Sequence, residues 1–220
     1  MKGPSVRTSK LLAVAALAAI AGCTTPAPDP GADEAAFKQM MASSFRDKGI
    51  ARVERLQQDE SDAACSRAGG APLPEAQALA IRDQNRATVK MPADGRFLGD
   101  WRAGEKLAQS GKGMSWSDAS TATRENGGSC YNCHQIGPQE IAYGTIGPSL
   151  FHYLANHEAS DPQGAAARRL VQVTWIRLYN AKALNACSVM PRFGHAGLLD
   201  EKQLKDLMAL LLDPDSPVNR

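Results

Sequence analysis

The most specific chemical signal in the 220-residue chain is the run Cys130-Tyr131-Asn132-Cys133-His134. On a helical turn, spacings of three and four residues place the two thiols and the imidazole on one face. Two such thiols can bond to the vinyl groups of a haem while the imidazole faces its iron, and C-x-x-C-H is the attachment motif of c-type haem. The run therefore predicts one covalent haem c, attached at Cys130 and Cys133, with His134 as an axial iron ligand. A redox-active C-x-x-C is the alternative, but it is expected within a βαβ pattern, and the sequence shows none.

The sixth ligand of the iron is predicted to be Met190, which begins a Met-Pro-Arg-Phe-Gly run. A thioether sulfur is soft and neutral, so it favours ferrous over ferric iron and raises the reduction potential. A second Met-Pro pair, at Met91, precedes the haem motif and is not expected to reach the iron. Three histidines remain as alternative ligands: His152, His157 and His195.

A haem-ligating histidine normally donates its other ring N–H to a fixed acceptor. Pro148, in the run Gly-Pro-Ser-Leu, offers a carbonyl on a rigid loop and is the candidate acceptor for His134. The alternative for this run is a simple turn. Trp175 and Arg192 are considered as partners of the haem propionates.

The first residues have the layout of a bacterial export signal. Lys2, Arg7 and Lys10 precede an apolar run over residues 11–20, which is too short to span a bilayer. The run ends in Ile-Ala-Gly-Cys, which resembles a lipobox, so residues 1–22 are predicted to be a lipoprotein signal peptide and Cys23 the lipidated residue. An ordinary signal cleaved nearby is the alternative. The predicted location is the periplasm, with the membrane reached through the lipid alone.

Two cysteines remain once Cys23 and the haem motif are assigned, namely Cys65 and Cys187. Because the compartment of an exported protein is oxidising, these two are predicted to form a disulfide. Two buried free thiols are the alternative.

The chain is predicted to be all-α, because no segment alternates in polarity as a strand does. Gly104 should let another helix pack closely on its own helix. Asp200 and Gln203 have the spacing of a capping box, and Pro214 should end the helix that they begin. Helices are expected over residues 37–56, 74–89, 100–108, 166–184 and 200–213.

Composition divides the chain into four parts. Residues 23–35, rich in Pro, Ala and Asp, are predicted to be a flexible tether. Residues 36–92 should form a helical N-terminal extension and residues 93–220 the haem domain. The net charge of +2 becomes −1 once residues 1–22 are removed, and neither value suggests nucleic acid as a partner.

Taken together, these motifs resemble the class I cytochromes c, in which the first and last helices cross and a G-P-x-L turn follows C-x-x-C-H. The haem domain resembles more closely the SoxX family, the small cytochrome subunits of the SoxAX complex of bacterial sulfur oxidation. The runs that carry this resemblance are residues 111–118, 126–134, 143–150, 179–182 and 185–195.

The resemblance implies a place in an L-cysteine S-thiosulfotransferase, which oxidatively joins thiosulfate to a cysteine of a SoxY-type carrier protein. The reaction would occur on a SoxA-type cytochrome partner, so no catalytic residue is expected on this chain. The haem held by His134 and Met190 would accept the released electrons and pass them to a soluble cytochrome c. A free-standing electron shuttle is the main alternative; a haem sensor or peroxidase would need an open sixth position, which Met190 disfavours.

Overall fold

The computed structural model describes residues 30–113, 115–120 and 122–220. The predicted signal peptide, the predicted lipidation site Cys23 and residues 24–29 of the predicted tether lie outside the described residues. The chain divides into two compact units, residues 1–44 and residues 45–220, so the extension predicted over 36–92 falls partly in each. No helix within the described ranges is long and apolar enough to cross a membrane.

The described residues of the first unit form helix α1 (Pro30–Ser44). Proline is tolerated at the first position of a helix, where its missing N–H has no partner in any case. Asp33 lies in the first turn, where a negative charge interacts favourably with the helix dipole. Residues 30–35, which the sequence analysis placed in the tether, are helical.

The described residues of the second unit contain five further helices of eight or more residues, with short helical turns between them. The helices are α2 (Glu60–Arg67), α3 (Glu75–Ala87), α4 (Trp101–Gln109), α6 (Ala165–Tyr179) and α7 (Glu201–Leu212), and α5 (Tyr153–Asn156) is a single turn. The 3-10 turns are η1 (Val53–Leu56), η2 (Thr123–Glu125), η3 (Cys130–Asn132) and η4 (Ala181–Ala183). Apart from one bridge between Lys48 and Ala51, the described chain has no β structure. The all-α prediction is confirmed.

Helix α7 begins at the predicted capping box. The Gln203 backbone N–H donates to the Asp200 side chain at 2.8 Å, and the Asp200 backbone N–H donates to the Gln203 side chain at 2.9 Å. Both donors would otherwise have no partner at the start of the helix. From Asp206 to Leu212 every residue of the helix is buried, so α7 is the central element of the core.

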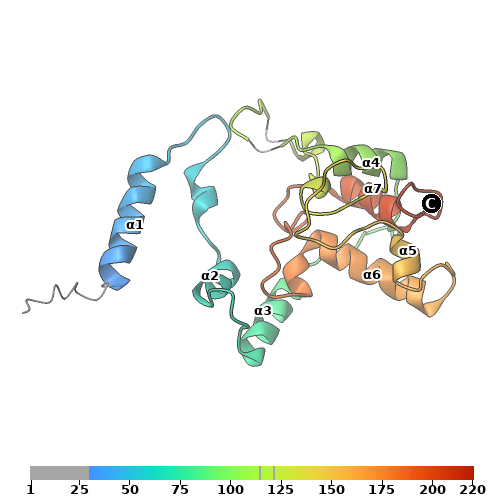
Figure 1. Ribbon diagram of the computed structural model, residues 1–220, viewed down its shortest axis with the longest axis horizontal. Coiled ribbons are helices and arrows are strands. Elements are labelled where there is room, and N and C mark those ends of the chain that lie inside the picture. Colours follow the sequence, from blue (N-terminus) through green and yellow to red (C-terminus); the bar gives the residue numbers. More distant parts are fainter. Residues whose placement is uncertain (1–29, 114, 121) are drawn as a thin grey trace, which may run out of the picture. The chain divides into compact units, whose positions relative to one another are not determined.

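Helix α4 packs closely against α7, and the two are drawn side by side in Figure 1. Gly104 lies at their contact, where a side chain would collide with the backbone carbonyl of Asp206. The start of α4 is also tied to α7, because the Asp100 backbone N–H donates to Asp206 Oδ1 at 2.9 Å. The prediction that Gly104 permits close approach of another helix is confirmed.

The main hydrophobic core lies between α6 and α7. Trp175 is 1% exposed, and its indole Nε1 donates to the backbone carbonyl of Lys90 at 2.8 Å. Phe97 packs edge-on against the Trp175 ring, with ring centroids 5.5 Å apart. Other members of this core are Leu170, Leu178, Leu204, Leu207, Met208, Leu210 and Leu211.

Three helix predictions differ from the structure. The helix expected over 37–56 ends at Ser44, and the turn that follows contains Gly49 at a φ of +57°, a value that favours glycine. The helix expected to reach residue 184 ends at Tyr179, because Asn180 is extended and its side chain caps η4. Helix α2 was not predicted, although Asp59 caps it by accepting from the Asp62 backbone N–H.

Candidate haem-binding site

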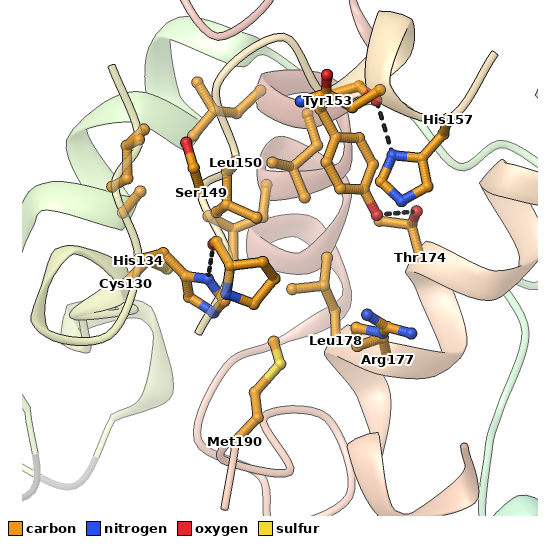
Figure 2. Close-up of a pocket in the computed structure, with 17 residues that line it drawn as sticks. Cys130, His134, Ser149, Leu150, Tyr153, His157, Thr174, Arg177, Leu178 and Met190 are labelled. Carbon is orange, nitrogen blue, oxygen red and sulfur yellow. Dashed lines mark hydrogen bonds between the residues drawn. The ribbon is translucent and has the colours of Figure 1, made fainter. Parts of the chain in front are cut away.

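A cavity of about 280 Å³ lies among α5, α6 and α7 and the loops that carry the sequence motifs. Cys130, His134, Pro148 and Met190 all line it, and they come from three stretches of the chain. Figure 2 shows Met190 extending into the cavity on the side of His134. Three of the four predicted haem-motif and ligand residues therefore meet at one cavity, and Cys133 is half-buried without lining it.

The cysteine motif forms a tight turn rather than the expected helix. Cys130–Asn132 is a 3-10 turn, and the His134 backbone N–H donates to the Cys130 carbonyl at 2.9 Å. Ser129, which precedes the turn, has a φ of +52° and so redirects the chain into it. Cys130 and Cys133 do not form a disulfide, either with each other or with another cysteine of the described residues.

The His134 ring is held in one orientation by the loop that contains Pro148. His134 Nδ1 lies 2.6 Å from the Pro148 carbonyl oxygen, as the sequence led us to expect. A carbonyl can only accept, so Nδ1 donates to it, and Nε2 is the ring nitrogen left to ligate a metal. Gly147 lies against the imidazole, and a side chain there would collide with the ring.

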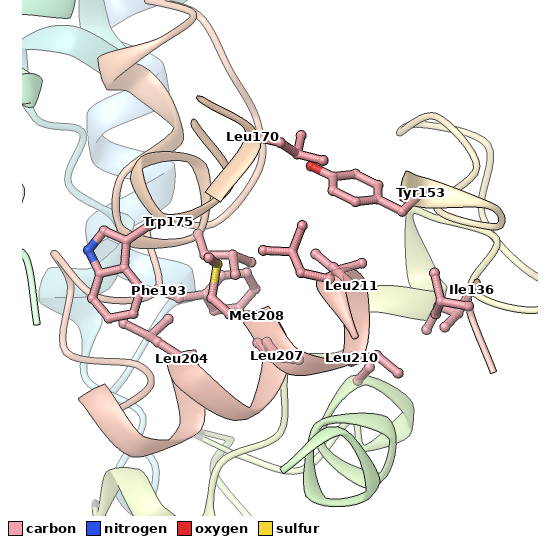
Figure 3. Packing of buried hydrophobic residues seen from close by; sticks show 14 of the residues in the cluster. Ile136, Tyr153, Leu170, Trp175, Phe193, Leu204, Leu207, Met208, Leu210 and Leu211 are labelled. Atoms are coloured by element: carbon pink, nitrogen blue, oxygen red, sulfur yellow. The ribbon is translucent and has the colours of Figure 1, made fainter. Parts of the chain in front are cut away.

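Apolar side chains from the core form much of the cavity wall. Figure 3 shows Leu207, Leu210 and Leu211 on α7, and all three line the cavity. Leu150 and Leu178 add apolar surface from other elements. Such walls exclude water and suit a large apolar ligand.

The cavity also has a polar side, formed by α5 and α6. The Tyr153 hydroxyl is hydrogen-bonded to Thr174 Oγ1 at 2.9 Å, and burial raises the pKa of Tyr153. His157 Nδ1 lies 2.8 Å from the Tyr153 carbonyl. Within the described residues, the guanidinium of Arg177 has neither a hydrogen bond nor an ion pair. Thr174, Arg177 and Leu178 share one face of α6 through their i, i+3, i+4 spacing, and the packing of α6 turns this face toward the cavity.

The two residues considered for the haem propionates do not line the cavity. Trp175 Nε1 is bonded to the Lys90 carbonyl, and Arg192 forms ion pairs with Asp59 and Asp62. Both side chains therefore have partners outside the cavity. The basic side chains that do line the cavity, besides His134, are Arg177 and His157.

The remaining alternative ligands occupy different places. Met91 is 51% exposed, and neither it nor His152 nor His195 lines the cavity. Burial and the nearby Arg192 charge lower the pKa of His195. His157 does line the cavity, but Figure 2 shows it beyond Tyr153 from His134.

The cavity residues fit a haem better than a bare metal ion. A haem iron receives four nitrogen ligands from its porphyrin and needs two from the protein, and His134 and Met190 are the pair predicted from the sequence. In the part of the chain that the structure describes, no three His, Cys, Asp or Glu residues are grouped as for a metal ion.

The surroundings of Cys130 differ from those of a redox-active thiol. Burial raises the pKa of the Cys130 thiol to about 12. Reactive C-x-x-C cysteines have lowered pKa values, because the thiolate is the reactive form. The environment of this thiol therefore disfavours the alternative interpretation of the motif.

Cys65 and Cys187 form a disulfide, as predicted. The bond joins α2 to the loop between η4 and Met190, across a separation of 122 positions in sequence. The alternative of two free thiols is excluded for this pair.

No protein-family model matches the chain. The chain is 35% identical over 187 residues to a protein of Aquifex aeolicus (strain VF5) named "uncharacterized lipoprotein". The match covers 83% of this chain and 80% of that protein.

Proposed function

The chain belongs to the same family as the Aquifex aeolicus lipoprotein, and we propose that it is a mono-haem c-type cytochrome that transfers electrons. The observation that carries the proposal is the meeting of Cys130, His134, Pro148 and Met190 at one cavity with apolar walls. Pro148 and Met190 lie outside the cysteine motif in sequence, so chance resemblance to a haem motif does not explain why they meet it at the cavity.

Each residue has a role in holding the haem. Cys130 and Cys133 would form the thioether bonds, and His134 Nε2 and Met190 Sδ would ligate the iron. The Pro148 carbonyl keeps the His134 ring in its ligating form. Arg177 and His157 would face the propionates, whose negative charge suits the basic side chains of the cavity.

Bound haem would supply reversible one-electron chemistry at its iron. The neutral Met190 thioether and the leucine walls both disfavour the extra charge of the ferric state. This chain would therefore have a high reduction potential and act as an electron acceptor.

The finer proposal is that residues 93–220 form a class I cytochrome c domain of the SoxX type. The close packing of α4 on α7 and the Pro148 turn after the cysteine motif support it. In this proposal the chain is the electron-accepting subunit of an L-cysteine S-thiosulfotransferase. It would work with a SoxA-type cytochrome, a SoxY-type carrier and a soluble cytochrome c. A free electron shuttle would use the same haem site and is the second candidate.

We further propose that the protein is tethered in the periplasm through lipidated Cys23. The name of the Aquifex aeolicus relative, a lipoprotein, supports an anchor of this kind. Cys23→Ser should release the protein from the membrane fraction if the lipid is its anchor.

Substitution of Met190 tests the ligand assignment. Met190→Ala should retain the covalent haem, detected by haem staining of the denatured chain, but lose the sulfur-to-iron charge-transfer band at the red end of the ferric spectrum. Met91→Ala is the matched control and should keep the band, because Met91 does not line the cavity. An unchanged spectrum in the Met190 variant would falsify this assignment.

Isolation of the protein from its own cells distinguishes the two functions. Copurification with a second cytochrome, together with loss of thiosulfate-dependent cytochrome reduction on deletion, is expected for a SoxX-type subunit. A lone monomer and unchanged reduction would favour the free shuttle.

A further inference from the structure

One carboxylate in α2 contacts both ends of the segment that carries Met190. Asp62 Oδ1 lies 2.8 Å from Lys182 Nζ, and Asp62 Oδ2 lies 3.6 Å from Arg192 Nη2. Asp59, the N-cap of α2, adds a contact to Arg192 Nη2 at 2.5 Å. Lys182 precedes Met190 in the sequence and Arg192 follows it. Residues 182–192 therefore form a loop whose two ends, its base, are joined through Asp62.

The middle of this loop is attached to the same helix. Cys65 follows Asp62 by three residues, so both side chains lie on one face of α2, and Cys65 is bonded to Cys187. Ala64 and Ala186, the neighbours of these two cysteines in sequence, are buried in one small apolar cluster. Helix α2 therefore holds the loop at its base and at its middle.

The ion pair at the base of the loop is protected from water on its lysine side. The Lys182 side chain is only 5% exposed, and its other contact is the Ala186 carbonyl at 3.3 Å. A buried ammonium that loses its carboxylate is strongly unfavourable. The Lys182 ammonium has its carboxylate partner only in the closed loop, and that partner is Asp62.

We propose that Asp62 is a positioning residue for Met190: by holding both ends of the loop, it keeps the thioether at the haem iron. The proposal rests on the proposed function, in which Met190 is an axial ligand. A neutral thioether is displaced by imidazole when the loop opens, and the apparent affinity for imidazole reports the fraction of open protein.

Asp62→Asn in the holoprotein tests the proposal, with Asp94→Asn as the matched control. Asp94 pairs with Lys205 at 2.9 Å, outside residues 182–192. Imidazole binding to the ferric haem should tighten about tenfold in D62N and stay within about twofold of the unsubstituted protein in D94N. The reduction potential should fall in D62N alone, an effect that a loss of stability without loop opening would not produce.

Amide hydrogen exchange over residues 184–195 provides a readout that does not depend on the haem. Exchange there should be faster in D62N than in D94N. Equal exchange and equal imidazole affinity in the two variants would overturn the positioning role while leaving the haem assignment intact. If Met190 proves not to be an iron ligand, both the Met190 assignment and the positioning role of Asp62 are overturned. Faster amide exchange in D62N would still show that Asp62 holds the loop closed.

If D62N does not fold, the double variant D62N/K182M gives the answer, because it leaves no unpaired buried ammonium. The double variant still lacks the ion pair between residues 62 and 182 at the base of the loop. We therefore again expect it to bind imidazole more tightly than D94N does. Binding equal to that of D94N would overturn the proposal.

Discussion

At the scale of single residues, the site depends on a few close contacts around His134. The Pro148 carbonyl fixes the protonated nitrogen of the ring, and Gly147 leaves room for the ring itself. Residue types and spacing in the sequence identified His134, Pro148 and Met190 as partners. The same reasoning did not find Arg177, whose place at the cavity depends on how α6 packs.

Gly147→Ala should disturb the haem site through a single methyl group. The added carbon would collide with the His134 ring, and overpacking of this kind costs about 1–3 kcal/mol. We expect less haem-loaded protein and a lower unfolding free energy, measured by haem absorbance and denaturant titration. Gly137→Ala is the control, because no atom lies within 4 Å of a side-chain carbon at that position. Equal effects of the two substitutions would contradict the role of Gly147.

At the scale of elements, α7 is a helix that could be predicted from residues close together in the sequence. Its capping box and apolar spacing are local features, and its start was predicted correctly. Helix α2 was missed because its eight residues show little apolar periodicity and its partners, Lys182 and Cys187, lie far away in sequence. Such contacts between distant charged side chains leave no spacing signal in a single sequence.

The bond between α2 and the Met190 loop should contribute strongly to stability. For a separation of 122 positions, loop-closure entropy gives about 4–5 kcal/mol, which is an upper figure. Cys65→Ala/Cys187→Ala should therefore lower the unfolding free energy by up to about 4 kcal/mol in denaturant titration. Thiol reduction of the unsubstituted protein should produce a similar loss and should have no further effect on the double variant. A change below about 1 kcal/mol would show that the loop is held by its other contacts.

At the scale of the whole molecule, residues 45–220 form one compact unit in which early and late parts of the sequence hold each other. The all-α class could be predicted from the absence of strand patterns, but the ion pairs that join distant segments could not. Two of these pairs join Asp94 to Lys205 and Asp59 to Arg192.

Because of these ion pairs, the unfolding free energy of the protein should decrease at acid pH. The hydrogen bond from Lys205 holds the pKa of Asp94 at about 2, below its ordinary 3.8. Burial raises the pKa of Asp59, but hydrogen bonds from the Asp62 backbone and Arg192 outweigh it and lower the pKa overall. A folded pKa below the unfolded one stabilises the protein above about pH 4, and this contribution is lost as the pH falls toward about 2.

Unfolding free energies measured at about pH 5 and about pH 2.5 should therefore differ, with the lower value at the more acid pH. The difference should be smaller in Asp94→Asn, which has no carboxylate to protonate at that position. An equal difference in the two proteins would show that Asp94 does not contribute to the acid sensitivity.

The Cys65–Cys187 disulfide and the two motif cysteines also bear on the order in which haem attachment and disulfide formation occur. An exported chain with Cys65, Cys130, Cys133 and Cys187 all reduced could form two disulfides in three different ways. On the proposed function, thioether formation removes Cys130 and Cys133 from this choice and leaves one pairing, the one observed. Haem attachment before oxidation would then prevent mispairing, because Cys130 and Cys133 would no longer be available to Cys65 or Cys187.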